Sequence, residues 1–285
     1  MPKAFCPGHI TCFFHPVRTD DVLTTGSRGA GIRLSKGAFV TLEERSDSKI
    51  EVTMDGVPSE AKVTRKVLEL IRPGEGFDVT IENELPVSQG FGMSAAGAIA
   101  VSLAAIGEYS DDIFRYAHMA EVSEGGGLGD VTALMCPGHQ PVRERPGLPP
   151  SGSIIDTGLR FENLTLAVFG DKLNTGSVIN DPDVCSLMDD VGRRMVDSHL
   201  SDPSIDGLFR KSREFSRSVG LESLVVGTAL DLLEPYGHAG MCMLGHSIFT
   251  DISESNTKSN NGNFQLCGQV LQSKRKSLPQ SREYG

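Results

Sequence analysis

Long apolar runs are missing from this 285-residue sequence. It contains no stretch of eighteen or more consecutive apolar residues, and therefore no candidate for a membrane-spanning helix. The first residues, MPKAFCPGH, lack the apolar core of a signal peptide and lead directly into strand-like sequence. The six cysteines are scattered, which favours a reducing compartment over a secreted disulfide scaffold. We therefore expect a cytoplasmic protein without membrane contacts.

Positive charge is also scarce. The chain has 27 basic and 37 acidic residues, a net charge of -10, and no strong basic run before its polar end. Proteins that bind nucleic acids usually present a basic face, so we expect no nucleic-acid partner. The hydrophobic share of 39% is ordinary for a globular protein. The length suits one large domain or two modest ones.

Four potential metal ligands lie close to the N-terminus. In CPGHITCFFHP, Cys6, His9, Cys12 and His15 recur every three residues, and such spacing suggests a zinc site. On a strand, however, the cysteines would face one side and the histidines the other. A helix would have to carry Pro7 in its first turn. Neither form gathers four ligands, so a zinc module is the weaker interpretation, and metal analysis of the purified protein would decide.

The apolar periodicity predicts a mixed order of helices and strands. Strands are expected within 36–54, over 77–86 and over 164–170; helices are expected over 59–71, 95–106, 111–124 and between 181 and 235. The proline-rich stretch 137–152 predicts a surface connection and a domain boundary. The residues from 252 onward are polar and weakly periodic. We therefore expect domains over 1–145 and 153–251, followed by a weakly ordered tail over 252–285.

The strongest chemical signal is PVSQGFGMSAAGAIAVSLAAIG, residues 86–107. A strand is followed by Gly90 and Gly92 and then by a helix of small residues that begins near Ser94. The first turn of a helix has unpaired N–H groups and a partial positive charge, both of which bind phosphate. Glycines let the backbone approach a phosphate closely. The Gly-Lys-Ser/Thr ending of a Walker loop is missing, and a glycine-rich turn before a buried helix is the simpler alternative.

This stretch resembles the phosphate loop of the GHMP kinases, the superfamily of galactokinase and of homoserine, mevalonate and phosphomevalonate kinases. Their loop usually reads Pro-x-x-x-Gly-Leu-Gly-Ser-Ser-Ala. This sequence differs at Phe91 and Met93 and retains Ser94. The resemblance implies ATP as the phosphoryl donor. It also implies that the nucleotide is bound by the loop residues Pro86, Gly90, Phe91, Gly92, Met93, Ser94, Ala95 and Ala96.

The resemblance implies a fold as well. GHMP kinases are two-domain α+β proteins, with an N-terminal domain like ribosomal protein S5, a ferredoxin-like C-terminal domain and ATP in the cleft between them. AFCPGHIT resembles their first motif, a strand that ends in Pro-Gly beside the substrate; many members continue with Lys or Arg where this chain has His9. The stretch 238–250 takes the place of their C-terminal glycine-rich motif but is poor in glycine. Considered alone, it would be a buried strand.

Acidic residues follow in AHMAEVSEGGGLGDVTAL, residues 117–134. The segment is similar to the glutamate and Ser-Gly-x-x-Asp segment of the superfamily. The resemblance places Asp130 beside the acceptor hydroxyl and assigns Mg²⁺ to Glu121 together with Ser94. Glu124 is a rival ligand. Without the resemblance, Asp130 would be interpreted as a turn or capping residue after a flexible glycine loop.

Five stretches resemble one branch of the superfamily more specifically. PGHITCFF, TGSRGAGIRLSKGA, AHMAEVSEGGGLGDVTA, NTGSVINDP and GMCMLGHSIF are similar to the archaeal pantoate kinases, which phosphorylate the primary hydroxyl of pantoate with ATP on the way to coenzyme A. Pantoate is a small anion whose carboxylate favours a forked cation. Arg28 is the candidate for that contact, with His9 as a nearby polar contact; a solvated surface arginine is the alternative. The family also leads us to expect a homodimer.

Other functions remain compatible with the sequence. Within the enzyme class, a kinase of the homoserine or mevalonate type is the alternative. Outside it, a GHMP-like protein that binds a ligand without catalysis would keep the cleft and lose the acid. The presence of Ser94, Glu121 and Asp130 favours an enzyme.

Overall fold

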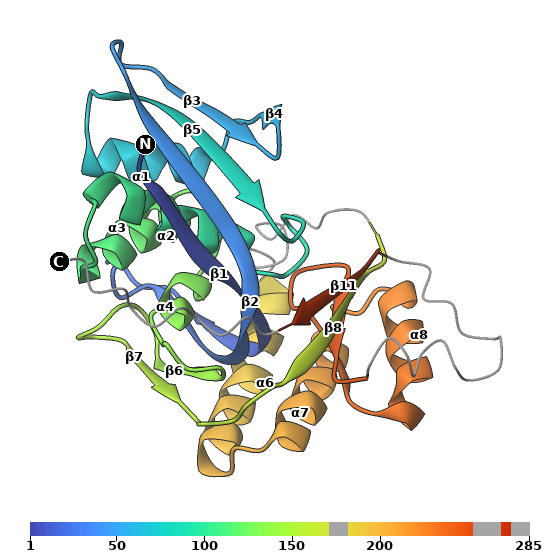
Figure 1. Ribbon diagram of the computed structural model, residues 1–285. Helices are drawn as coiled ribbons and strands as arrows, with labels where there is room; N and C mark the ends of the chain where they lie inside the picture. The colour runs from blue at the N-terminus through green and yellow to red at the C-terminus, as the bar shows by residue number, and fades with distance from the viewer. Residues whose placement is uncertain (171–181, 253–268, 275–285) are drawn as a thin grey trace.

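The computed structural model describes residues 1–170, 182–252 and 269–274 (Figure 1). Its first sheet has the order β4-β3-β5-β2-β6-β7, with β1 also paired to β2. The strands are β1 Lys3–Val17, β2 Gly26–Arg45, β3 Ile50–Met54, β4 Val57–Pro58, β5 Gly76–Asn83, β6 Pro141–Arg145 and β7 Ser153–Asp156. β1 and β2 form a long antiparallel pair, and only β3 and β5 pair in parallel.

Strand β1 packs against helices from both halves of the chain, α2 Met93–Ile106 and α6 Pro182–Ser201. A strand that is covered on both sides is apolar almost throughout, and this explains the opening motif: Cys6, His9 and Cys12 are all buried. The strand continues through Pro-Gly with an irregularity in its pairing between Pro7 and His9, so the expected end at Pro-Gly is wrong. Nowhere in the described residues do three His, Cys, Asp or Glu side chains meet as a metal site.

Three helices pack together behind the first sheet (Figure 1). They are α1 Lys62–Ile71, α2 Met93–Ile106 and α3 Asp111–Ser123. Helix α2 is buried along nearly its whole length, as its uniformly apolar sequence predicts. It begins at Met93, because Gly92 adopts a left-handed backbone conformation there (φ 64°) and turns the chain into the helix. The phosphate-loop candidate therefore leads into a rigid, buried element.

The proline-rich stretch 137–152 is not the surface connection that its composition predicts. It contains β6, which pairs with β2 and, through β7, extends the first sheet. Pro141 opens the strand, a position where its missing N–H is tolerated, and Arg143 in the middle of the strand is only 1% exposed. Pro146, Pro149 and Pro150 lie in the turn between β6 and β7. The proposed division into two domains stays a prediction.

The second sheet has the order β11-β8-β10-β9. Its strands are β8 Asn163–Val168, β9 Ala239–Met241, β10 Ser247–Thr250 and β11 Gln269–Lys274. Strand β11 comes from the tail that we expected to be weakly ordered, and it pairs antiparallel with β8. The other tail residues after 252 lie outside the described residues, as does most of the NTGSVINDP stretch.

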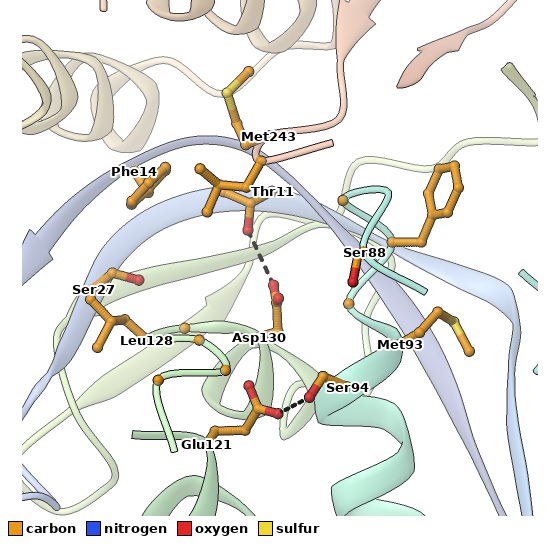
Figure 2. A pocket seen from close by; sticks show the side chains of 18 of the residues that line it. Thr11, Phe14, Ser27, Ser88, Met93, Ser94, Glu121, Leu128, Asp130 and Met243 are labelled. Atoms are coloured by element: carbon orange, nitrogen blue, oxygen red, sulfur yellow. Dashed lines mark hydrogen bonds between the residues drawn. The ribbon is translucent and has the colours of Figure 1, made fainter. Parts of the chain in front are cut away.

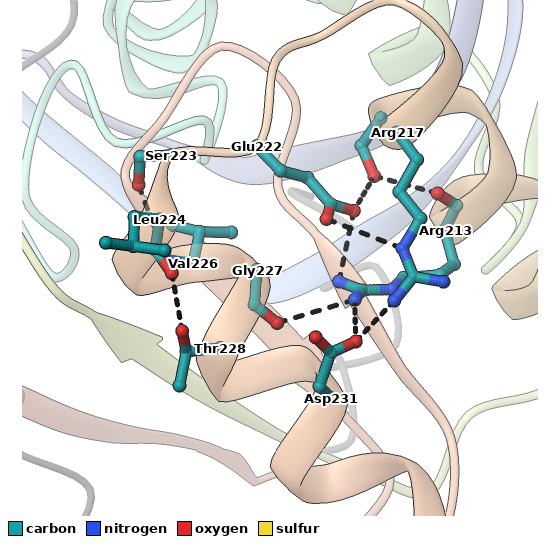
Figure 3. A network of polar contacts seen from close by, with 10 residues as sticks. Arg213, Arg217, Glu222, Ser223, Leu224, Val226, Gly227, Thr228 and Asp231 are labelled. Atoms are coloured by element: carbon teal, nitrogen blue, oxygen red, sulfur yellow. Dashed lines mark hydrogen bonds and ion pairs between the residues drawn. The ribbon is translucent and has the colours of Figure 1, made fainter.

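Three further helices are α6 Pro182–Ser201, α7 Ile205–Ser218 and α8 Leu224–Leu233. Helices α7 and α8 pack against β9 of the second sheet, whereas α6 packs mainly against β1 and α7. Arginines from α7 join α7 to α8 (Figure 3): Arg213 pairs with Glu222 at 3.0 Å and with Asp231 at 2.5 Å, and Arg217 pairs with both acids. Glu222 also accepts a hydrogen bond from Ser216. No helix in the described ranges is long and apolar enough to cross a membrane.

Candidate active site

A cavity of about 460 Å³ opens where the phosphate-loop candidate, the glycine loop 125–129 and the loop between β9 and β10 meet (Figure 2). Strands β1 and β2 contribute Thr11, Phe14 and Ser27 to its wall. The phosphate-loop candidate, the acidic segment and part of the stretch 238–250 therefore surround one space, although they are far apart in the sequence.

The phosphate-loop candidate is held against β1. The His9 N–H donates a hydrogen bond to the Phe91 carbonyl at 3.0 Å. A Cβ at Gly92 would lie 2.9 Å from the His9 carbonyl oxygen, and Gly90 and Gly92 both have positive φ angles. Only glycine accepts both constraints without strain. The loop thus brings the N-terminus of α2, with its unpaired N–H groups, to the cavity.

Glu121 on α3 faces Ser94 in the first turn of α2. The Ser94 hydroxyl donates a hydrogen bond to the Glu121 carboxylate, and both residues line the cavity (Figure 2). Burial, together with the nearby charge of Asp130, raises the pKa of Glu121 to about 7, although the Ser94 hydrogen bond opposes the shift. Glu124 is exposed at the end of α3 and does not line the cavity. Of the two rival glutamates, only Glu121 faces Ser94.

Asp130 is the first residue of the short helix α4, Asp130–Leu134, and its side chain is 30% exposed. Its Oδ1 accepts hydrogen bonds from His9 Nδ1 at 2.8 Å and from the Thr11 hydroxyl at 3.3 Å. Burial alone would raise the pKa of Asp130, but the His9 hydrogen bond and the charge of Arg143 outweigh it and hold the pKa below its ordinary value. The residue is therefore a charged carboxylate at neutral pH, and it faces the cavity.

His9 is fully buried and is not part of the cavity wall. Its Nδ1 contacts Asp130, while Nε2 has no hydrogen-bond partner in the described part of the chain. Burial lowers the pKa of His9, so the ring is neutral and donates through Nδ1. His9 thus contacts the catalytic candidate Asp130, whereas the sequence suggested a contact with substrate.

Arg143 on β6 is a site residue that the sequence analysis missed. It lines the cavity at 1% exposure. Its Nε donates to the Ser27 carbonyl at 3.2 Å, and its Nη1 has no hydrogen-bond partner among the described residues. Burial lowers the pKa of Arg143 to about 10, and the Asp130 charge opposes the shift. The guanidinium is still charged at neutral pH, and a buried cation with a free donor favours an anionic ligand.

Comparisons with known proteins agree with this geometry. Residues 61–138 match the model of the GHMP kinases N terminal domain. The pantoate kinase of Thermococcus kodakarensis is 34% identical over 265 residues, which cover 87% of this chain and 86% of that protein. The chain belongs to the GHMP kinase superfamily. The pantoate kinase of Methanospirillum hungatei is 32% identical, with 86% of each chain covered.

Solved structures confirm the mixed α+β fold of a GHMP kinase. A phosphotransferase related to the coenzyme A biosynthesis pathway has a TM-score of 0.78 at 30% identity and covers 87% of this kinase and 86% of its own chain. The mevalonate kinase of Methanococcus jannaschii has a TM-score of 0.62 at 14% identity, with 89% and 91% covered. At 14% identity, the similarity to this mevalonate kinase shows a shared fold alone.

The kinase brings most of its predicted phosphate-loop residues to the cavity. Those that line it are Gly90, Phe91, Gly92, Met93 and Ser94; Pro86, Ala95 and Ala96 do not. The loop between β9 and β10 contributes Met243 and Leu244. The stretch 238–250 is therefore partly strand, as the simpler interpretation had it, and partly cavity wall.

Arg28 does not line the cavity of the kinase. Its Nη2 pairs with Asp197 on α6 at 2.6 Å, and its Nε donates to the Glu144 carbonyl at 2.7 Å. Both guanidinium contacts join β2 to neighbouring elements. The contacts of Arg28 thus connect structural elements outside the cavity, and the positive charge in the cavity wall belongs to Arg143. The sequence favoured Arg28 because we expected it in a glycine-flanked turn, but it lies on β2. Arg143 lay in a stretch interpreted as surface.

Proposed function

We propose that this GHMP kinase transfers the γ-phosphoryl group of ATP to the primary hydroxyl of pantoate and forms 4-phosphopantoate for coenzyme A biosynthesis. The observation that carries the proposal is the shared cavity of the phosphate loop, the charged carboxylate of Asp130 and the buried cation of Arg143. The pantoate kinases among its relatives support the choice of substrate.

Ser94 and Glu121 suit Mg²⁺ bound together with ATP. Mg²⁺ prefers oxygen ligands and commonly takes only one or two from the protein, with nucleotide phosphates and water as the others. The Ser94 hydroxyl and the Glu121 carboxylate are adjacent at the N-terminus of α2. When bound, the ion neutralises charge on the phosphates. Because Glu121 has a pKa of about 7, it must release a proton before it can act as a ligand.

Asp130 is placed to orient the acceptor hydroxyl. Its Oδ1 already accepts two hydrogen bonds, from His9 and Thr11, which leaves Oδ2 for the hydroxyl of the substrate. As the new O–P bond forms and the bond from the γ-phosphorus to the ADP oxygen breaks, the hydroxyl proton passes to Oδ2. The pKa of Asp130 is low, so its main contribution is to orient the hydroxyl, which suits the late proton loss of a loose transition state.

Arg143 is the proposed partner of the pantoate carboxylate. Its guanidinium lies beside Gly29 and Gly129: a Cβ would lie 2.4 Å from Nη2 at Gly29 and 2.7 Å from Nε at Gly129. The two glycines thus make room for the guanidinium beside Asp130. A carboxylate held by a planar fork fixes both the position and the orientation of a small substrate.

One part of the wall is apolar and suits the two methyl groups of pantoate. Phe14, Leu128 and Met243 line the cavity and are at most 8% exposed. Phe14 lies on the same strand as Thr11, and Leu128 lies two residues before Asp130. Both side chains therefore flank the end of the cavity where the acceptor hydroxyl would bind (Figure 2). Homoserine has an ammonium group and no methyl branches, and it would leave this wall without a partner. The wall therefore favours pantoate over homoserine.

A substrate panel tests the proposal. Pantoate, its analogue without methyl groups (2,4-dihydroxybutanoate), homoserine and mevalonate are each assayed with ATP and Mg²⁺. We expect pantoate to have the highest kcat/KM, roughly ten- to a hundredfold above the analogue, because each buried methyl contributes about 0.8 kcal/mol or more. A better turnover of homoserine or mevalonate would overturn the choice of substrate. No turnover with any of the four would support a ligand-binding protein without catalysis.

A pair of arginine variants tests the carboxylate contact. Arg143→Lys keeps the charge and removes the fork, so the KM for pantoate should rise about tenfold or more while the KM for ATP changes little. Arg28→Lys is the matched control, because it makes the same change outside the cavity. If Arg28→Lys raised the pantoate KM and Arg143→Lys did not, the assignment would be reversed.

A further inference from the structure

Gln89 links the phosphate loop to the second sheet. The residue precedes Gly90 and is 4% exposed. Its Nε2 donates to the Gly170 carbonyl at 3.0 Å, and its Oε1 accepts from the His246 N–H at 3.1 Å. The Gln89 carbonyl also accepts a hydrogen bond from the Ser247 hydroxyl at 2.5 Å. Gly170 follows β8 and Ser247 opens β10, so all three bonds cross from the loop to the second sheet.

The two segments also touch backbone to backbone. A Cβ at Gly90 would lie 2.7 Å from the Cys242 carbonyl oxygen, and a Cβ at Gly245 would lie 2.2 Å from the Gln89 carbonyl. Such contacts leave no room for a side chain at either glycine. Within the stretch 238–250, Gly245 is the glycine that lies against the backbone of Gln89. The phosphate loop therefore rests on the loop between β9 and β10 as well as on β1.

We infer that Gln89 is a positioning residue for the nucleotide. It does not line the cavity, so it acts through the backbone of Gly90 and Gly92. Loop amides bind phosphate strongly only when they are already in the bound conformation, because a free loop must lose conformational entropy on binding. The hydrogen bonds of Gln89 and Ser247 remove that freedom in advance. The inference rests on the proposed function only in that the protein binds ATP; it does not require pantoate to be the acceptor.

Gln89→Met tests the inference, because methionine keeps the length of the side chain and removes both polar atoms. We expect the KM for ATP to rise about five- to thirtyfold, as the loss of one or two hydrogen bonds predicts, with the KM for pantoate within about twofold. Isothermal calorimetry with ADP and Mg²⁺ should show a parallel loss of affinity. Equal rises in both KM values, or unchanged ADP affinity, would overturn the inference.

Gln140→Met is the matched control. Gln140 is fully buried, and its side chain also bonds across elements, to the Gly31 carbonyl at 3.2 Å and to His199 at 3.0 Å. The variant should lower the melting temperature to a similar extent and leave ADP affinity unchanged. An equal loss of ADP affinity in both variants would reduce Gln89 to a stability residue.

Ser247→Ala keeps the inference testable if Gln89→Met fails to fold. It removes a single hydroxyl that holds the same loop, and it should lower ADP affinity in the same direction by about fivefold. Unchanged ADP affinity in folded Ser247→Ala would contradict the inference. Because the probe is ADP, the result does not depend on pantoate, and an enzyme that failed to phosphorylate pantoate would still report on Gln89.

Discussion

Glu121→Gln should stabilise the protein at alkaline pH while it removes activity. In the folded protein the pKa of Glu121 is raised from 4.5 to about 7 by burial. Unfolding restores the ordinary pKa, so the folded state binds this proton more tightly, and stability is lost as the pH rises from about 4.5 to about 7. A shift of about 2.5 units corresponds to roughly 3 kcal/mol. Glutamine has no charge and escapes this cost.

Urea unfolding at pH 5 and pH 8 measures the effect. At pH 8 the variant should be more stable than the wild type by up to about 3 kcal/mol, and at pH 5 the difference should fall to about 1 kcal/mol or less. Glu124→Gln, a change at an exposed glutamate of the same helix end, should show neither effect. A gain that was equal at both pH values, or absent at pH 8, would refute the argument that burial raises the pKa of Glu121.

Three shorter predictions follow from the same site. Wild-type activity should fall below about pH 7, where Glu121 is protonated, and extra Mg²⁺ should move that midpoint to lower pH; a midpoint independent of Mg²⁺ would contradict the role of Glu121 as a ligand. Gly92→Val should weaken ATP binding more than Gly107→Ala, because both glycines have positive φ but only Gly92 lies against His9. Arg28→Ala should lower the free energy of unfolding by about 1 kcal/mol or less and leave the pantoate KM unchanged; a raised KM would return Arg28 to the site.

The sequence predicted those parts of the site that lie on one continuous segment. The loop from Gly90 to Ser94 could be found because a strand, glycines and a helix of small residues follow one another, and this order places helix N–H groups at a loop. Asp130 and Glu121 were assigned because the segment around their glycine loop resembles that of the GHMP kinases; without this resemblance, Asp130 would have been interpreted as a turn or capping residue. In each case the chemistry depends on neighbours in the sequence.

The parts that could not be predicted depend on contacts between distant segments. Arg143 is a charged residue in a proline-rich stretch, and only the pairing of β6 with β2 shows that it is buried. His9 was interpreted as a substrate contact, because the sequence does not show that its ring points toward Asp130. Gln89 has no sequence signal: its partners Gly170 and His246 lie on other elements.

The most direct test of the central claim, that the cavity is a phosphoryl-transfer site with Asp130 beside the acceptor, is the turnover of Asp130→Asn. Asparagine can still accept the His9 and Thr11 hydrogen bonds through its oxygen, so the variant should fold and bind ADP and pantoate. Its NH2 group then takes the place of Oδ2 and can neither accept the hydrogen bond that orients the substrate hydroxyl nor take its proton, so kcat should fall about a hundredfold or more. Steady-state kinetics and calorimetric binding on one preparation measure both effects. Near-normal turnover in a folded variant would contradict the account.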